Sequence, residues 1–314
     1  MSLSDIGDAI VSALRTHELL PRSSGWVASI APGGSTDRTF TVIDPDGVPT
    51  FTARLARTEL EAWLRREEAV LRELAESDDA CSPMRVTRIE ASEGLPADLL
   101  VHEHMPGNNA PADSVSLTAR ERLGEALALV HRHPRVGYMI WPALEPRAGT
   151  RADNYRDRVA SLHRYRSSIT LPEAEARILA LEAASATLPP ENGWLDTVFA
   201  LLHGDLSPGN ILWDDDDVHL IDWEFARDGD PAEDLAYLIS QGNLTPDTFA
   251  DIAEAYVTAS GDPWAIARVS AWLPLVKLDA ELWWADWGTT SPPVPLSQFW
   301  EGWLQHLTAW VWAA

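Results

Sequence analysis

The chain has 314 residues, of which 46% are hydrophobic and 23% are charged. This length suits two lobes at about 100–200 residues per domain, and the balanced composition excludes a disordered or fibrous protein. Aspartate and glutamate number 48 against 24 lysines and arginines, so the net charge of −24 disfavours nucleic acid and anionic membranes as partners. The same charge attracts a cationic small molecule, although an acidic surface also serves solubility alone.

The cysteine content and the composition of residues 1–20 and 298–314 indicate the cellular compartment. Cys81 is the only cysteine, which excludes an internal disulfide and a multi-cysteine metal site and fits a reducing compartment. Residues 1–20 are amphipathic and include acidic side chains, unlike a signal peptide. Residues 298–314 contain polar interruptions, whereas a membrane span needs about 18 apolar residues in a row. We therefore expect a cytoplasmic protein without a membrane span.

The beginning of the chain predicts a small antiparallel sheet. Residues 24–56 alternate between apolar and polar positions, with an Asp-Gly pair as a tight turn, and predict three strands. Residues 58–76 have apolar side chains at helical spacing among many charges, and predict one helix packed on the sheet. Two further strands are expected at 84–91 and 98–104.

The remainder of the chain predicts mostly helices. Helical periodicity covers residues 117–133 and much of 150–188, and it returns after Pro231. Between these helices, residues 196–222 hold short apolar runs separated by polar loops, as short strands do. Loops of that kind are where catalytic side chains tend to lie.

A connector divides these two parts. It contains two prolines, a glycine and polar residues in quick succession, which places the boundary near Pro106. We therefore predict an α+β protein with an N-terminal lobe over residues 1–105 and a C-terminal lobe over residues 106–314.

One segment carries a dense polar motif. Residues 203–222 contain the spacing His-x-Asp-x-x-x-x-Asn, followed by an apolar run that ends in aspartate, and its members are His203, Asp205, Asn210 and Asp222. This segment resembles the catalytic region of the aminoglycoside phosphotransferase and choline kinase family, in its apolar as well as its polar residues. The resemblance implies a bilobal protein-kinase-like fold and an ATP-dependent kinase of small molecules.

The residue types of this motif suit phosphoryl transfer. The reaction needs a carboxylate that orients the acceptor hydroxyl and takes its proton, and a divalent metal that bridges phosphate oxygens. Asp205 fits the first role, and Asn210 and Asp222 offer hard oxygen ligands for Mg²⁺. In the alternative interpretation Asp205 and Asn210 only cap turns, which leaves the match at four positions unexplained.

The resemblance also implies roles for neighbouring residues. Asp234 resembles the family's aspartate that braces the catalytic loop from a following helix, and His203 is expected to belong to the loop's architecture. Arg54 stands where kinase-like folds place a basic residue on the phosphates, with Glu67 on the next helix as its partner. Arg57 is the alternative to Arg54, and an ordinary surface ion pair is the alternative role of Arg54 and Glu67.

The expected nucleotide contacts lie in a glycine pair and in the connector. Gly33, Gly34 and Ser35 fall between two predicted strands, where glycines let backbone N–H groups approach phosphate oxygens. The resemblance implies that backbone groups at Glu103 and Met105 hold the adenine. The implied cofactors are Mg²⁺ and ATP, with GTP as an open alternative.

The acceptor is the least specified part of the prediction. Glu224 is a candidate for contact with the metal or a substrate amine, or is simply a solvated carboxylate. Further along, Asp279 lies among Trp283 and Trp287, and an acidic, aromatic surface holds an ammonium group by charge and cation–π attraction. The two tryptophans share a helix face, which core packing also produces. The favoured acceptor is an aminoglycoside, choline or another amino alcohol, and the alternative is a neutral sugar, nucleoside or macrolide.

Other classes of protein fit less well. A protein kinase would have His-Arg-Asp where this loop has His-Gly-Asp. A metal-dependent hydrolase would need a histidine ligand pair, and His131 instead resembles a structural histidine of the family. A non-catalytic nucleotide-binding protein on the same scaffold is the remaining alternative, and Asp37 favours it because the family often has asparagine there. The sequence indicates no oligomeric state.

Overall fold

The structure is a computed structural model that describes most of the chain. The described residues are 2–22, 24–31, 38–56, 61–77, 81–92, 94–143, 145–167, 174–242 and 244–286. Two compact units are formed, the first by Met1–Gly107 with His219–Glu224 and the second by Asn108–Val218 with Phe225–Ala314. The segment that carries Asp222 therefore groups with the N-terminal part of the chain, although it follows the catalytic loop in sequence.

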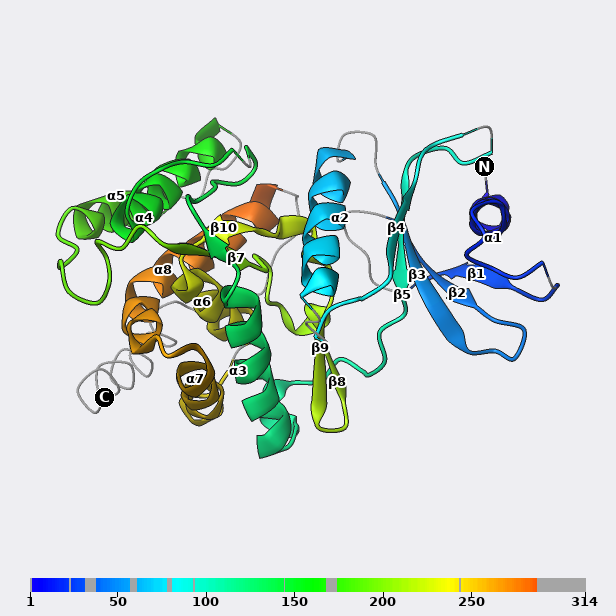
Figure 1. The fold of residues 1–314 in the computed structure, drawn as a ribbon. Coiled ribbons are helices and arrows are strands. Elements are labelled where there is room, and N and C mark those ends of the chain that lie inside the picture. The colour runs from blue at the N-terminus through cyan, green and yellow to red at the C-terminus, as the bar shows by residue number, and fades with distance from the viewer. Residues whose placement is uncertain are drawn as a thin grey trace. The chain divides into compact units, whose positions relative to one another are not determined.

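The first unit is built on a five-stranded antiparallel sheet in the order β1-β2-β3-β5-β4 (Figure 1). The expected Asp-Gly turn joins β2 to β3, where Gly47 has a φ of 88° and the Asp44 side chain accepts from two backbone N–H groups. The strands are β1 (Val27–Ile30), β2 (Arg38–Ile43), β3 (Pro49–Leu55), β4 (Val86–Ile89) and β5 (Leu99–Glu103).

Helices cover the two faces of this sheet in different ways (Figure 1). α1 (Leu3–Thr16) packs apolar side chains against one face, in a buried cluster with Phe40, Ala53 and Leu55. α2 (Glu61–Glu76) lies on the other face, toward which strand alternation turns Arg54. One face of the sheet is thus an apolar core, and the other presents charged groups.

The second unit is mainly helical, as predicted. A short antiparallel sheet in the order β10-β7-β6 lies among the helices. The helices are α3 (Leu117–His131), α4 (Arg151–Ser161), α5 (Ala174–Ser185), α6 (Pro231–Gly242), α7 (Pro246–Ser260) and α8 (Pro263–Asp286). The remaining elements of the chain are β6 (Pro134–Arg135), β7 (Phe199–Leu202), β8 (Ile211–Asp214), β9 (Asp217–Leu220), β10 (Arg227–Gly229), and the 3₁₀ helices η2 (Ala112–Ser114), η3 (Leu162–Ser167), η4 (Pro208–Asn210) and η5 (Trp223–Phe225). Both β9 and η5 are divided between the two units.

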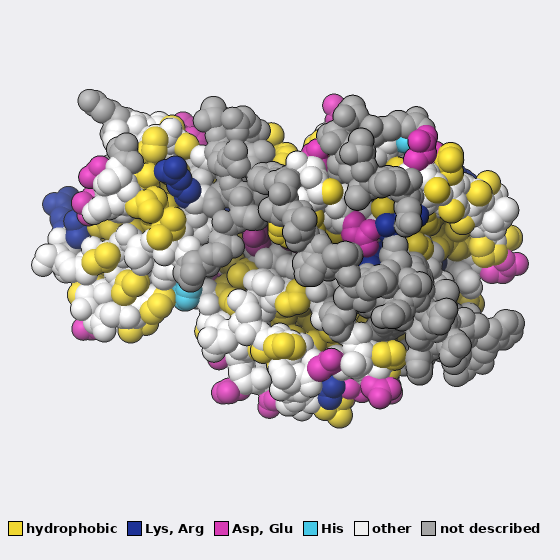
Figure 2. Space-filling model, turned by 180° about the vertical axis from the view of Figure 1, so that it is seen from behind, with side chains coloured by type: hydrophobic (Ala, Val, Ile, Leu, Met, Phe, Trp, Pro, Cys, Tyr) yellow, Lys and Arg dark blue, Asp and Glu magenta, His cyan; other side chains and the backbone are white. Residues whose placement is uncertain are grey.

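Two further features are the distribution of charged side chains on the surface and the apolar character of the helices. Among the described side chains in Figure 2, acidic and basic groups form small separate clusters. Among the helices of the described ranges, none combines the length and the apolar character that crossing a bilayer requires.

Candidate active site

The catalytic-loop motif begins at the end of a buried strand. All four apolar residues of β7 are buried, and β7 pairs antiparallel with β10 in the register Leu202↔Arg227. His203 follows directly and is also buried, whereas Asp205 is only half-buried. The strand therefore fixes where the loop starts, and the loop brings Asp205 toward solvent.

Asn210 holds the side chain of Asp205. The short helix η4 turns the chain back, so Nδ2 of Asn210 donates to Oδ2 and to the backbone carbonyl of Asp205, both at 2.9 Å. Because this nitrogen is committed to Asp205, Oδ1 is the atom of Asn210 that can ligate a cation. The structure thus brings together two residues that the motif singled out.

Asp234 braces the loop from the first turn of α6. Its Oδ2 accepts from the N–H of His203 at 2.7 Å, its Oδ1 accepts from the N–H of Gly204 at 2.9 Å, and Nε2 of His131 lies 3.3 Å from Oδ2. Burial raises the pKa of Asp234, but the hydrogen bond and attraction from His131 outweigh it, and the net pKa lies below the ordinary value of 3.8. An ionised carboxylate therefore anchors the two residues that precede Asp205.

A second brace was not expected from the sequence. Nδ2 of Asn109 lies 3.0 Å from each of the carbonyl oxygens of Pro208, Gly209 and Ile211, which surround Asn210. Asn109 belongs to the predicted connector, and asparagine is common in any turn, so no local signal marks it. Its partners lie about a hundred positions away in the sequence.

In the first unit, Arg54 forms ion pairs with three carboxylates. Nη1 donates to Oε1 and Oε2 of Glu67 at 2.7 and 2.8 Å and to Oδ1 of Asp222 at 2.8 Å, while Nη2 donates to Oε2 of Glu224 at 2.7 Å. Arg54, Glu67 and Glu224 are 4%, 1% and 3% exposed. Since both members are buried, Arg54 and Glu67 do not form a surface ion pair.

Asp222 is the accessible member of this cluster. Its side chain is 38% exposed, and its φ of 66° lies in the left-handed region that residues other than glycine rarely adopt. Burial lowers the pKa of neighbouring His102 to about 4, so its imidazole is neutral at pH 7. Arg54, Glu67, Asp222 and Glu224 together contribute one positive and three negative formal charges.

The carboxylate oxygens of this cluster suit a magnesium ion that binds together with a nucleotide. Mg²⁺ prefers hard oxygen ligands and commonly takes one or two from the protein, completing its shell with phosphate and water. Asp222 supplies such an oxygen at an accessible position. Within the described ranges, no group of three or more His, Cys, Asp or Glu side chains is placed to hold a metal by itself.

Comparison with known proteins assigns the family. The model of the phosphotransferase enzyme family matches residues 27–272. The chain belongs to this family. It is accordingly a phosphotransferase with a hydroxyl group as acceptor, as the sequence analysis predicted.

Individual relatives are distant. Protein LicA of Haemophilus influenzae is 34% identical over 61 residues, a match that spans only 19% of this chain and 18% of LicA. A choline/ethanolamine kinase family protein from Mesorhizobium loti has a TM-score of 0.58 at 17% identity, with 96% of this chain and 95% of that chain covered. A spectinomycin phosphotransferase solved with ADP and spectinomycin has a TM-score of 0.60 at 12% identity, with 97% of each chain covered. These likenesses confirm the predicted α+β, bilobal, protein-kinase-like fold.

Several predicted nucleotide contacts of the phosphotransferase stay predictions. Gly33, Gly34, Ser35, Asp37 and Arg57 lie outside the described residues. Glu103 ends β5, where its N–H donates to the carbonyl of Arg85 at 3.2 Å and its carboxylate accepts from the N–H of Met84 at 2.5 Å. Met105 is buried just beyond that strand.

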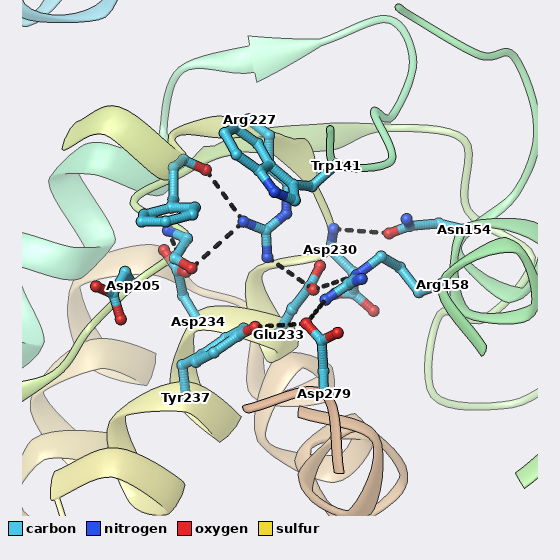
Figure 3. A network of polar contacts seen from close by, with 12 residues as sticks. Trp141, Asn154, Arg158, Asp205, Arg227, Asp230, Glu233, Asp234, Tyr237 and Asp279 are labelled. Atoms are coloured by element: carbon cyan, nitrogen blue, oxygen red, sulfur yellow. Dashed lines mark hydrogen bonds and ion pairs between the residues drawn. The ribbon is translucent and has the colours of Figure 1, made fainter. Parts of the chain in front are cut away.

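Asp279, a predicted acceptor contact, is engaged inside the second unit (Figure 3). It is 6% exposed, and its oxygens accept from Nη2 of Arg158 at 3.0 Å, from Nη2 of Arg164 at 2.7 Å and from the hydroxyl of Tyr237 at 3.1 Å. Burial raises the pKa of Asp279, but the two arginines outweigh it and the net pKa is lowered. These contacts favour an internal ion-pair role for this carboxylate.

Of the two tryptophans of the predicted acceptor surface, the structure describes only Trp283. Trp283 is half-buried on α8 and packs edge to face on Trp284, with ring centroids 4.8 Å apart. Trp287 lies outside the described residues. An acceptor role for Trp283 therefore stays a prediction.

Proposed function

We propose that this enzyme transfers the γ-phosphate of ATP to a hydroxyl group of a small, amine-bearing acceptor, with Asp205 as the catalytic carboxylate. The fixing of Asp205 from two sides supports the proposal most directly. Asn210 holds its carboxylate at 2.9 Å, and Asp234 holds the backbone of the two preceding residues. A carboxylate held in this way has a defined direction, and alignment is most of what a protein contributes to phosphoryl transfer.

In the proposed reaction, Asp205 accepts a hydrogen bond from the acceptor hydroxyl and directs its oxygen toward the γ-phosphorus. The new oxygen–phosphorus bond forms as the bond to the β–γ bridging oxygen breaks, and the hydroxyl proton passes to Asp205. Mg²⁺, when bound, neutralises charge on the phosphate oxygens, and we assign Asn210 and Asp222 as its protein ligands. Asp205 then returns its proton to solvent.

Arg54 is proposed to meet the α- and β-phosphates after an exchange of partners. Both of its terminal nitrogens already donate to carboxylates. Mg-ATP brings an anion that suits Arg54 together with a cation that suits Asp222. Phosphate oxygens would therefore replace Asp222 at the guanidinium, while Glu67 keeps the arginine in place.

An amine on the acceptor is supported by charge and by the named relatives. The net charge of −24 favours a cation over an anion. The compared proteins include a member of a choline/ethanolamine kinase family and an enzyme solved with spectinomycin. Because Asp279 is paired internally, we place amine recognition at other residues, with Trp283 as the described candidate.

An ADP-release screen with Mg-ATP tests the proposal. The panel holds aminoglycosides, choline, ethanolamine and other amino alcohols, with sugars, nucleosides and macrolides as neutral comparators, and Mg-GTP is run in parallel. We expect an amine-bearing compound to stimulate ADP release, and the Asp205→Asn variant to lose about 10²–10⁴-fold of that rate because it lacks the base. Binding of Mg-ATP, measured by calorimetry, should persist in the variant.

The two parts of the proposal fail separately. Full transfer by Asp205→Asn would remove Asp205 from the catalytic role. Turnover with neutral compounds alone would overturn the amine-bearing class and leave the phosphotransfer assignment standing.

A further inference from the structure

A buried arginine lies against the catalytic loop. Arg227 begins β10 and is 2% exposed. Its Nη1 donates to the carbonyl oxygen of Gly204 at 3.3 Å and to that of Phe225 at 3.1 Å, while Nη2 donates to Oε1 of Glu233 at 2.8 Å (Figure 3). One guanidinium thus connects the residue before Asp205 with the segment that follows the Asp-Trp-Glu sequence.

The backbone at Gly204 leaves the space that this guanidinium fills. Gly204 has a φ of +83°, and a Cβ added there would lie 2.3 Å from Nη1 of Arg227 and 2.3 Å from the carbonyl oxygen of Phe225. Both the conformation and the space therefore require glycine. A side chain at position 204, such as the arginine of the protein-kinase motif, would displace Arg227.

The peptide that leads into Asp205 is held at both of its polar atoms. Its carbonyl oxygen, on Gly204, accepts from Arg227, and its N–H, on Asp205, donates to Nδ1 of His203 at 3.3 Å. The rotation of this peptide plane sets the backbone angle at Asp205, and hence the direction in which the carboxylate leaves the chain.

The position and charge of Arg227 are themselves fixed. Burial lowers the pKa of this guanidinium, but attraction to Glu233 outweighs burial, and the net pKa is raised. The aromatic ring of Tyr237 also lies beneath it, 5.9 Å from Cζ to the ring centroid. A permanently charged donor is therefore aimed at the loop by groups on α6.

We propose that Arg227 is a positioning residue for Asp205, which acts by fixing the carbonyl of Gly204. This inference rests on the proposed catalytic role of Asp205. Arg227 acts on the reaction only through the loop, so its loss lowers turnover more than it weakens nucleotide binding.

Arg158 offers a matched comparison. It is 1% exposed, and its Nε donates to the same Oε1 of Glu233 at 2.7 Å. Its other described hydrogen bonds go to Asp279 and Ser161, and none of them reaches the catalytic loop. Arg158→Met and Arg227→Met each remove a buried cation from Glu233, but only the second also removes a donor from the loop.

The first test needs no acceptor. His203-Gly204 is the only His-Gly pair in the sequence, so ¹³C-carbonyl histidine with ¹⁵N-glycine labelling gives a single NMR cross-peak for the Gly204 amide. We expect this peak to move in Arg227→Met and to keep its wild-type position in Arg158→Met. An unmoved peak in Arg227→Met, or equal shifts in both variants, would overturn the proposal.

The second test is kinetic and uses the acceptor with the strongest ADP release in the panel. We expect kcat per folded molecule to fall about 10- to 100-fold in Arg227→Met, with the KM for Mg-ATP changed less than about threefold. Arg158→Met should keep the wild-type kcat, and Arg227→Lys should recover part of the loss because it keeps a charged donor. Equal kcat values in the two methionine variants would contradict the inference.

Asp205→Asn, run beside them, separates the two proposals. Activity retained in Asp205→Asn would contradict the proposed catalytic role of Asp205. An inactive Asp205→Asn together with a fully active Arg227→Met would contradict only the positioning role of Arg227. If Arg227→Met does not fold, Arg227→Gln takes its place in both tests, because it lacks the charge and the forked pair of donors. A wild-type peak position with wild-type kcat in that variant would then contradict the proposal.

Discussion

Two buried arginine clusters in this molecule differ in balance and in exposure. In the first unit, Arg54 contacts three carboxylates, and one of them, on Asp222, is 38% exposed. In the second unit, Arg158 and Arg227 share Glu233, and Arg158 also pairs with Asp279, so that two arginines face two carboxylates. Arg158, Arg227, Glu233 and Asp279 are 1%, 2%, 1% and 6% exposed. A surplus of carboxylate with one accessible member suits an incoming cation, whereas matched and enclosed charges suit a scaffold.

Because of this difference, substitutions in the two clusters should affect different properties, stability in one case and binding in the other. Enclosed ions depend on their partners, because water cannot replace a partner that is lost, and removing one costs stability. Turnover is affected as well only where the ion also contacts the catalytic loop, as Arg227 does. An accessible carboxylate is solvated when its partner is lost, so its substitution mainly affects whatever it binds.

The largest effect is expected at Asp222. Asp222→Ala removes the proposed metal ligand, and turnover at fixed Mg²⁺ should fall about 10²–10³-fold, because a metal's charge stabilisation amounts to several kcal/mol. The unfolding midpoint should change little, since the side chain is 38% exposed. Mg²⁺ titrations of the ADP-release rate measure the effect, with exposed Asp216→Ala as the control. An unaltered Mg²⁺ dependence would contradict the assignment.

Arg54→Met should be the most destabilising of these variants. It leaves the buried carboxylates of Glu67 and Glu224 without this cation, and loss of one partner from a buried pair costs about 3–5 kcal/mol. Urea unfolding monitored by tryptophan fluorescence measures the loss. Arg65→Met, which removes an exposed pair with Glu61, should unfold like the wild type. Equal stability of the two variants would show that burial of the Arg54 cluster carries no energetic weight.

Sequence reasoning located the catalytic loop because its partners are close in the chain. Asp205 and Asn210 are five positions apart, and a single turn brings them together. The family resemblance likewise paired Arg54 with Glu67, thirteen positions away, and the two side chains are in contact in the structure. In such cases the local pattern and the tertiary contact agree.

Contacts over long separations carried no such signal. Arg227 was not singled out, because its place against Gly204 depends on the pairing of β10 with β7. The sequence around Asp279 suggested a cation site, yet arginines 115 and 121 positions away occupy that carboxylate. Composition near a residue shows its neighbours along the chain, whereas its charge partners are set by packing.

Asp279→Asn tests whether this carboxylate belongs to the scaffold. Losing charge-assisted hydrogen bonds with Arg158 and Arg164 should cost about 1.5–3 kcal/mol of unfolding free energy. The KM for a cationic acceptor should stay within about twofold of wild type, because the charge of Asp279 is already compensated internally. A large rise in that KM with unchanged stability would instead return Asp279 to the acceptor site.

The smallest effect is a pH dependence that scaffold carboxylates should share. Asp230 is fully buried and accepts from Nε and Nη2 of Arg268 at 2.8 and 2.7 Å. Burial raises its pKa, but the attraction of Arg268 outweighs burial, and the net pKa lies below 3.8. The unfolded chain therefore binds this proton more readily, so the stabilisation is complete above the unfolded value and is lost as the pH falls through the folded one.

Asp230→Asn should accordingly be most destabilising near neutral pH. The difference in unfolding free energy between wild type and variant should shrink as urea titrations move from about pH 7 toward pH 3. Exposed Asp247→Asn, on α7, should show a difference that stays small throughout. A stability difference for Asp230→Asn that widens in acid would mean that the carboxylate is protonated in the folded protein. The ionised scaffold inferred for the second unit would then be wrong at one of its fully buried members.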